Sequence, residues 1–400
     1  MQSDMPRSCD IFCKVIDNYG DIGVAWRLAR QLGNEHGLVV RLWVDDLNSF
    51  AKLCHEASPS AESQELQGVE VIRWGNEFLK VQPAQLVIET FACKLPEAYI
   101  SAMAKLSAHP VWINLEYLSA EHWVESHHKL PSPHSTLPLT KYFFFPGFTK
   151  QTGGLLLERD LLAYRDSFLT DKARQDLFWQ SIGLEKSPED TFKVSMFCYE
   201  NPALAELFDV WAHGEQAILC LIPEGHIMQL VGQYFDDDDP DAGKSYSRGN
   251  LRVLALPFVE QERYDELLWL CDVNFVRGED SFVRAQWAGK PFIWHIYPQH
   301  DAVHMDKLQA YLDKYCALLG VTACAALRDY WLIWNTASTL GQASSADSTE
   351  AWSALMDAFG ELESHAKQWA QQLSGNDLAL NLLDFLREIG KMRALENEGQ

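Results

Sequence analysis

The sequence predicts an α/β protein with two units in tandem, each built on a mostly parallel sheet. Short apolar runs alternate with amphipathic segments over residues 10–118 and again over residues 192–297. Apolar runs that are separated by helices are typical of parallel strands covered on both faces. The proline-rich stretch 127–154 breaks the alternation and is expected to be a long functional loop followed by a domain boundary.

The elements follow from this alternation. Strands are expected at residues 10–16, 38–44, 69–75, 85–92, 110–118, 192–200, 216–223, 251–259, 273–278 and 291–297. Helices are expected at 24–37, 95–106, 202–212, 261–271 and 280–290, and the last hundred residues look mostly helical. Paired sheets of this kind bind ligands at the carboxyl ends of the strands, in the crevice between the units. The expected domains are 1–155, 156–345 and a helical segment, 346–400, that packs partly back on the first.

Composition limits the classes of function. The chain has 400 residues, is 47% hydrophobic and carries a formal net charge of −23, which disfavours nucleic-acid and anionic membrane partners. It has no secretory signal and no run of eighteen apolar residues. None of the nine cysteines forms a C-x-x-C pair, so buried thiols in a reducing cytoplasm are expected, and no metal site.

The opening strand-to-helix turn, "IDNYGDIG" at residues 16–23, carries two carboxylates where a nucleotide-binding fold has its phosphate loop. Its glycines, Gly20 and Gly23, do not fit the G-x-G-x-x-G spacing of a dinucleotide fingerprint. Asp17 and Asp21 repel phosphates. They are either ordinary turn and N-cap residues or functional acids. Two acids in so short a turn exceed what one cap needs, which favours a functional role.

A second turn, "RGEDS" at residues 277–281, follows a predicted strand and opens a helix. A helix N-terminus with a hydroxyl suits a diphosphate, so Ser281 and the backbone at Asp280 are expected to bind one. Glu279 is better suited to sugar hydroxyls, and Arg277, followed by Gly278, can neutralise a phosphate or a neighbouring acid. The alternative is a capped helix, with Asp280 or Ser281 as its N-cap.

One βα unit earlier, Phe258 and Gln261 stand at a strand end just before a helix. An aromatic ring beside an amide suits a nucleobase, because the ring stacks on the base and the amide reads its edge. An aromatic residue at a strand end is more often part of the core, but the nearby turn at residues 277–281 favours the binding role.

Six blocks resemble the bacterial elongation factor P maturation arginine rhamnosyltransferases, the EarP family: "DIFCKVIDNYGDIGVAWRLARQL", "NLEYLSAEHW", "FFFPGF", "SMFCYEN", "LPFVEQERYDELLW" and "RGEDSFVRAQWAGKPFIWHIYPQ". The resemblance implies an inverting GT-B glycosyltransferase with two Rossmann-like domains facing a central cleft, the first on the acceptor side and the second binding nucleotide-sugar. It implies transfer of L-rhamnose from dTDP-β-L-rhamnose to one arginine of elongation factor P, in a reaction that needs no metal. This modification of elongation factor P is implied to help ribosomes through polyproline stretches.

The resemblance also implies roles for residues. The two essential aspartates of the family fall on Asp17 and Asp21, and its essential glutamate falls on Glu279. Asp21 is expected to be the base or orienting group for the acceptor, with Asp17 as its support. The donor site falls on Tyr199, Phe258, Gln261 and the turn at residues 277–281.

Two other functions compete with this one. The nearest is another GT-B nucleotide-sugar transferase or an epimerase with a different donor. The other is a non-catalytic acidic scaffold that binds a basic partner. The two acids of the first turn and the Glu-Asp-Ser of the second favour an enzyme over a scaffold.

Overall fold

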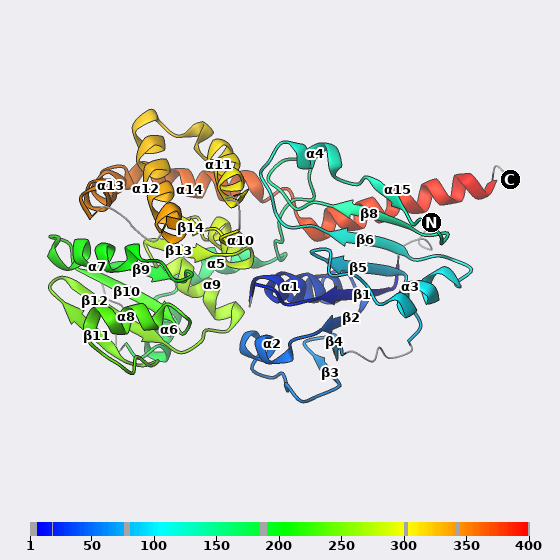
Figure 1. Cartoon of the computed structure of the whole chain (residues 1–400), viewed down its shortest axis with the longest axis horizontal. Helices are drawn as coiled ribbons and strands as arrows, with labels where there is room; N and C mark the ends of the chain where they lie inside the picture. The colour runs from blue at the N-terminus through cyan, green and yellow to red at the C-terminus, as the bar shows by residue number, and fades with distance from the viewer. Residues whose placement is uncertain are drawn as a thin grey trace. The chain divides into compact units, whose positions relative to one another are not determined.

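The computed structural model describes residues 6–17, 19–75, 81–184, 190–299, 303–340 and 345–398 (Figure 1). The chain divides into two compact units, which we call unit 1 (residues 1–159 with 373–400) and unit 2 (residues 160–372). The C-terminal segment 346–400 is therefore shared between them. Within the described ranges no helix is long and apolar enough to cross a membrane. No group of three or more His, Cys, Asp or Glu side chains there could hold a metal ion.

Unit 1 contains an eight-stranded sheet in the order β3-β4-β2-β1-β5-β6-β8-β7. The pairs are parallel except at the two edges, where β3 with β4 and β7 with β8 are antiparallel. The strands are β1 (Ser8–Cys13), β2 (Val39–Val44), β3 (Ser63–Leu66), β4 (Val69–Arg73), β5 (Leu86–Thr90), β6 (Val111–Leu115), β7 (Pro131–Pro133) and β8 (Thr140–Phe144).

The helices in the described part of unit 1 are α1 (Gly20–Asn34), α2 (Leu47–Leu53), α3 (Glu97–Ala104), α4 (Trp123–His127) and α15 (Leu378–Glu398). The C-terminal α15 lies beside β8, where Phe385 contacts the rings of Tyr142 and Phe144 (Figure 1). The backbone N–H of Leu378 donates to the carbonyl of Leu155, which ties the start of this helix to the segment after the sheet.

Asp10 in β1 is a polar centre inside the apolar core of unit 1. It is fully buried, and its carboxylate accepts two hydrogen bonds of 2.6 Å from the guanidinium of Arg41. The indole of Trp43, the backbone N–H of Ala84 and the hydroxyl of Tyr99 also donate to it. The buried charge of Asp10 is therefore paired with Arg41, and both carboxylate oxygens of Asp10 accept hydrogen bonds. These are the conditions for keeping an ion inside an apolar core.

The stretch 127–154 was expected to be a loop, and that expectation is wrong. It contains β7 and β8, and β8 pairs in parallel with β6 inside the sheet. The aromatic run "KYFFF" has high strand propensity, which the density of prolines hid. Pro131 and Pro133 are tolerated because β7 is an edge strand, where a missing N–H costs no ladder hydrogen bond.

Unit 2 contains a six-stranded sheet in the order β11-β12-β10-β9-β13-β14, parallel except for the edge pair β11 and β12. The strands are β9 (Phe192–Met196), β10 (Ile218–Pro223), β11 (Ser245–Arg248), β12 (Leu251–Leu256), β13 (Val273–Arg277) and β14 (Phe292–His295). The five parallel strands are those that the alternation of apolar runs predicted, and the short β11 was missed.

The helices of unit 2 are α5 (Leu161–Thr170), α6 (Lys172–Ser181), α7 (Ala203–His213), α8 (Met228–Phe235), α9 (Gln261–Leu270), α10 (Asp280–Ala288), α11 (Val303–Tyr315), the 3₁₀ turn η2 (Cys316–Leu318), α12 (Val321–Leu340), α13 (Ser345–Asp357) and α14 (Phe359–Leu373). All nine cysteines of the chain are free thiols, and eight are buried, which confirms their expected burial.

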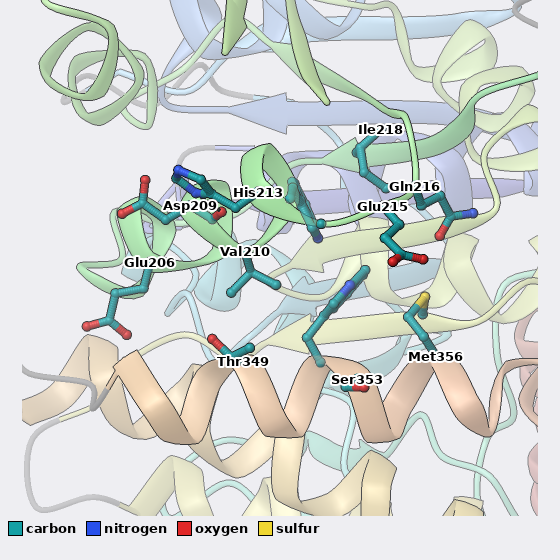
Figure 2. Close-up of a pocket in the computed structure, with 13 residues that line it drawn as sticks. Glu206, Asp209, Val210, His213, Glu215, Gln216, Ile218, Thr349, Ser353 and Met356 are labelled. Atoms are coloured by element: carbon teal, nitrogen blue, oxygen red, sulfur yellow. Dashed lines mark hydrogen bonds between the residues drawn. The ribbon is translucent and has the colours of Figure 1, made fainter. Parts of the chain in front are cut away.

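A cavity of about 680 Å³ opens between α7 and α13 of unit 2. Figure 2 shows Glu206 and Asp209 of α7 on one side, with Ser353 and Met356 of α13 on the other. Ile218, the first residue of β10, also lines it, so the cavity lies at the amino ends of the parallel strands. The predicted donor residues follow the carboxyl ends of these strands. They therefore lie at the opposite end of the strands from the cavity.

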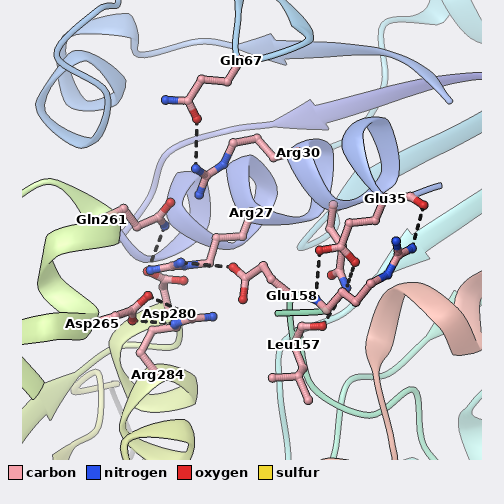
Figure 3. A network of polar contacts seen from close by, with 12 residues as sticks. Arg27, Arg30, Glu35, Gln67, Leu157, Glu158, Gln261, Asp265, Asp280 and Arg284 are labelled. Carbon is pink, nitrogen blue, oxygen red and sulfur yellow. Dashed lines mark hydrogen bonds and ion pairs between the residues drawn. The ribbon is translucent and has the colours of Figure 1, made fainter. Parts of the chain in front are cut away.

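A buried ion pair joins α9 to α10, the two helices that begin at the predicted donor residues. The Nε and Nη2 atoms of Arg284 donate to the two carboxylate oxygens of Asp265, each at 2.7 Å (Figure 3). Arg284 is 1% exposed and Asp265 is 5% exposed. The two hydrogen bonds hold α9 and α10 against each other. Separating the helices would leave a buried charge without its partner, which is strongly unfavourable.

We expect Asp265→Ala to lower the free energy of unfolding by about 3–5 kcal/mol, because it leaves the Arg284 guanidinium buried without its partner. Urea unfolding of the full chain measures this. Lys367→Ala is the matched control: it breaks the solvent-exposed ion pair with Glu363 in the same unit and should change stability little. Equal effects of the two substitutions would contradict the structural role given to the buried pair.

Candidate active site

Asp21 lies at the start of α1, in the turn that follows β1. Its Oδ2 atom accepts hydrogen bonds from the backbone N–H groups of Ile16, at 2.8 Å, and Asp17, at 2.9 Å. A side chain in the first helical turn that reaches back to the preceding backbone acts like the acid of a capping box. The helix begins at Gly20 rather than at residue 24, so Asp21 and Gly23 belong to the helix itself.

The second acid, Asp17, lies against the first residue of the helix. A Cβ atom added at Gly20 would stand 2.8 Å from Oδ2 of Asp17, closer than such atoms come in real structures. A side chain at position 20 would therefore require the Asp17 carboxylate to shift. The Gly20 N–H also donates to the Asp17 carbonyl at 2.7 Å, and the Gly23 N–H to the Tyr19 carbonyl at 2.9 Å, so both turn glycines help to close the turn.

The carboxyl of Asp21 is only 2% exposed, and burial raises its pKa above the usual value. The two backbone N–H donors oppose this rise, the negative charge of Asp17 adds to it, and a hydrogen bond from the Tyr117 side chain opposes it. The site thus holds an acid whose ionised form is disfavoured by desolvation. A cation brought to this turn would stabilise the ionised form, because opposite charges lower the pKa of a carboxyl.

In unit 2, the turn between β13 and α10 has a conformation that favours glycine. Gly278 has a φ of +58°, in the left-handed region. The indole N–H of Trp294 donates to the Gly278 carbonyl at 2.8 Å. The Ser281 hydroxyl accepts a hydrogen bond from the Arg277 N–H at 3.0 Å and donates to the Arg277 carbonyl. This hydroxyl closes its own turn, so the backbone N–H groups at the start of α10 are the better candidates for a diphosphate.

Arg277 ends β13 and lies against two aromatic rings. Its guanidinium is 4.5 Å from the ring centre of Phe197 and 4.7 Å from that of Tyr199. The side chain is 6% exposed, and such desolvation strengthens a cation–π interaction. The structure thus brings together Arg277 and Tyr199, which the sequence named separately, and adds Phe197. A guanidinium held in this way can stand beside a phosphate.

Behind Tyr199 lies a buried histidine. The ring of His295, at the end of β14, is 5.2 Å from that of Tyr199, and its side chain is fully buried. Neither of its ring nitrogens has a hydrogen-bond partner among the residues that the structure describes. Burial is the main reason that the pKa of His295 is lowered to about 3, and the nearby charges of Arg277 and His304 also contribute. It is therefore a neutral packing partner at physiological pH.

The remaining predicted donor residues come from the starts of α9 and α10. Gln261 is 4% exposed, and its amide donates to Oδ2 of Asp280 at 3.1 Å (Figure 3). This contact joins the two helix starts, and it uses the amide donor that was expected to read a base. Phe258 and Glu279 are half-buried, the first just before α9 and the second directly before α10.

Sequence reasoning missed Phe197, His295 and the Asp265–Arg284 pair. Phe197 directly follows β9, two residues before Tyr199, and alternation along an extended segment could have placed both on one face. His295 and the pair carry no signal in the sequence, because their roles depend on contacts between segments far apart in the chain.

Comparisons with known proteins identify the family of this chain. A family model described as Elongation-Factor P (EF-P) rhamnosyltransferase EarP matches residues 9–387. The protein-arginine rhamnosyltransferase of Pseudomonas putida is 48% identical over 384 residues, which are 96% of this chain and 99% of the relative. The chain belongs to the EarP family. The expected family is therefore confirmed.

Solved structures place the EarP family chain among GT-B glycosyltransferases. A structure described as the basis for EarP-mediated arginine glycosylation of translation elongation factor EF-P is 37% identical, with a TM-score of 0.67. The match covers 95% of this chain and 99% of that one. A glycosyltransferase of Rickettsia africae, 8% identical with a TM-score of 0.50, covers 97% of this chain and 98% of its own and shares the fold alone. The expected α/β fold with two Rossmann-like sheets is confirmed.

We expect Asp21→Asn to retain or raise the stability of this EarP family protein at neutral pH. The raised pKa means that the ionised carboxylate costs folding free energy above its folded-state pKa, and this cost is absent below its unfolded-state pKa. The amide oxygen of asparagine can still accept from Ile16 and Asp17. Urea unfolding across pH measures the difference from wild type, which should shrink as pH falls. A loss of stability at neutral pH that vanishes in acid would contradict the pKa direction.

Proposed function

We propose that this chain transfers L-rhamnose from dTDP-β-L-rhamnose to the guanidinium of one arginine of elongation factor P, with inversion at the anomeric carbon, in the cytoplasm. Membership of the EarP family supports the reaction class and the acceptor. One observation supports an arginine acceptor: the desolvated carboxylate of Asp21 lies beside a second acid, Asp17, in a turn where nucleotide-binding folds hold phosphate.

On the acceptor side, Asp21 receives the arginine. A guanidinium is planar and cationic and matches carboxylates in fork geometry. We assign Asp21 as the group in contact with the attacking nitrogen. Asp17, held against Gly20, supplies a second negative charge. Together the two acids orient one nitrogen toward the anomeric carbon and stabilise the cation before it reacts.

The pKa difference between the two groups limits how the proton leaves. Free aspartate titrates near ~3.9 and arginine near ~13.8, a gap of roughly ten units, or about 13 kcal/mol. Burial of Asp21 narrows this gap without closing it. The proton therefore passes to Asp21 as the C–N bond forms, when the nitrogen becomes acidic. The carboxylates act chiefly through position and electrostatics.

On the donor side, the bond between the anomeric carbon and the diphosphate oxygen breaks and dTDP leaves. The N-terminus of α10 and the Arg277 guanidinium stabilise the negative charge of this leaving group, which needs no metal in this scheme. Tyr199 and Phe258 provide aromatic surfaces for the nucleotide. Glu279 accepts hydrogen bonds from hydroxyls of the sugar.

We expect elongation factor P to gain one deoxyhexose when it is incubated with this chain and dTDP-β-L-rhamnose, with or without a chelator. Intact-mass spectrometry measures the increment. Asp21→Asn should lower turnover by at least about a hundredfold and leave donor binding intact, because it removes the charge that holds the nucleophile. Asp45→Asn is the matched control, since it removes an acid that binds the same loop at the Val15 N–H.

Each outcome of the mass experiment decides between functions. No increment with any thymidine, uridine or guanosine sugar would favour the acidic scaffold, and an increment with another sugar would favour a different donor. Loss of the product in chelator would overturn the metal-free scheme. If Asp21→Asn weakened donor binding and spared turnover, the assignment of Asp21 to the acceptor would be wrong.

Glu279→Ala should raise the KM for the donor roughly tenfold or more, because it removes charged hydrogen-bond acceptors from the sugar. Steady-state kinetics at saturating acceptor measure this. Glu215→Ala in the same unit is the control, because Glu215 lines the cavity at the amino ends of the strands, away from the predicted donor residues. An unchanged donor KM in Glu279→Ala would remove Glu279 from the donor site.

A further inference from the structure

Helix α12 contributes a buried amide to the edge of the sheet in unit 2. Asn335 is 1% exposed. Its Oδ1 atom accepts a hydrogen bond from the Ile296 N–H at 3.0 Å. Its Nδ2 atom donates to the Trp294 carbonyl at 2.8 Å and to the Trp331 carbonyl at 2.9 Å. The side chain therefore binds the backbone on both sides of residue 295, where β14 ends.

We propose that Asn335 is a positioning residue for the donor site. It holds the end of β14, and β14 in turn holds the turn at residues 277–281 and the ring of Tyr199. This inference rests on the proposed function, in which that turn and Tyr199 bind the nucleotide-sugar. Asn335 itself touches neither of them through any of these hydrogen bonds, so it acts through the strand.

The Asn335 amide takes the place of a neighbouring strand. β14 is the last strand of its sheet, and no other strand in the described part of unit 2 pairs with its outer edge. In a parallel pair, one residue binds the carbonyl before and the N–H after the residue opposite to it. Asn335 makes this same pair of contacts, to Trp294 and Ile296, which are 8% and 5% exposed. Without the amide, two buried backbone groups would lose a partner, which is costly.

Trp294 connects Asn335 to the donor turn. The carbonyl of Trp294 is bound by Asn335, and its indole N–H donates to the Gly278 carbonyl at 2.8 Å. Its ring stacks on that of Phe282, with ring centres 3.9 Å apart and planes 13° from parallel. Phe282 is fully buried in the first turn of α10. A shift of Trp294 would therefore move the backbone N–H groups that are proposed to bind the diphosphate.

The next residues of the same segment hold Tyr199. The rings of His295 and Tyr297 lie 5.2 Å and 5.5 Å from the ring of Tyr199, at interplanar angles of 82° and 78°. Residues 295 and 297 alternate with those that Asn335 binds, as side chains do along an extended segment. Two edge-on contacts fix the ring that packs against the Arg277 guanidinium.

A second buried amide ties α12 to the segment that carries Tyr199. Asn201 is fully buried, and its Nδ2 atom donates to the Trp334 carbonyl at 2.8 Å. Its Oδ1 atom accepts from the Ala203 N–H at 3.0 Å. Consecutive residues of α12, 334 and 335, therefore bind the two segments between which Tyr199 is packed. The helix sets the spacing of these segments, although none of its residues was predicted to belong to the site.

Asn335→Leu tests the proposal, because leucine is similar in size and lacks both the donor and the acceptor. We expect the Kd for dTDP alone, measured by isothermal titration calorimetry, to rise roughly tenfold or more, since small displacements of binding groups are costly. The KM for the nucleotide-sugar should rise with it. The KM for elongation factor P should stay unchanged, because the acceptor acids lie in unit 1.

Asn274→Leu is the matched control. Asn274 is a fully buried asparagine near the amino end of β13, and it binds the Leu268 carbonyl at 3.0 Å and the Ser195 hydroxyl at 2.6 Å. Its loss should lower the free energy of unfolding and leave the dTDP affinity of the folded protein unchanged. Equal weakening of dTDP binding in both variants would overturn the proposal, as would unchanged binding in Asn335→Leu.

Trp294→Phe provides a variant for the case in which Asn335→Leu does not fold. It keeps a ring against Phe282 and deletes only the N–H that binds the Gly278 carbonyl. We expect weaker dTDP binding and an unchanged KM for elongation factor P. Unchanged dTDP binding would break the connection from β14 to the turn and overturn the proposal.

A last readout needs neither ligand nor turnover. Hydrogen exchange of the ligand-free protein, followed by mass spectrometry, should become faster at residues 277–281 in Asn335→Leu and should match wild type there in Asn274→Leu. Equal exchange at this turn in wild type and Asn335→Leu would overturn the role of Asn335. If wild type transferred no deoxyhexose while the exchange difference persisted, the proposed function would fail and the hold of Asn335 on the turn would stand.

Discussion

The acceptor chemistry that we propose for this EarP family chain depends on one desolvated carboxylate. Asp21 is removed from water at the start of α1, and burial alone would favour its neutral form. The backbone N–H groups of Ile16 and Asp17 and the Tyr117 side chain lower the pKa of Asp21, but burial outweighs them and the pKa stays raised. A carboxylate in this state gains more from an incoming guanidinium than a solvated one does, because less water must be displaced.

The proposed donor residues of unit 2 face the opposite charge. A nucleoside diphosphate is negatively charged, and in the proposed function the helix N-terminus after β13 and Arg277 stabilise that charge. Two aromatic rings, those of Phe197 and Tyr199, hold that guanidinium in place. The Asp265–Arg284 pair holds α9 and α10 together, and with them the residues that begin both helices.

Much of this was predictable from the sequence, for physical reasons that differ between regions. The buried parallel strands follow from apolar runs, and the two turns follow from polar residues placed directly after such strands. The strand β8 was missed because prolines on both sides of "KYFFF" resemble a loop. The Ser281 hydroxyl was expected to bind phosphate but bonds to the backbone of Arg277, an alternative that the same residue type allows. Phe91 and Tyr117 could not be paired in advance, because their contact depends on the register of β5 and β6.

The most direct test of the central claim is the pKa of the Asp21 carboxyl in the presence of the acceptor. Carboxyl NMR titration can follow it in the free chain, in complex with elongation factor P, and in complex with elongation factor P whose acceptor arginine is replaced by glutamine. A guanidinium beside Asp21 should lower this pKa by about one to three units, and the glutamine acceptor should not. The same pKa in all three states would contradict the claim that Asp21 receives the arginine.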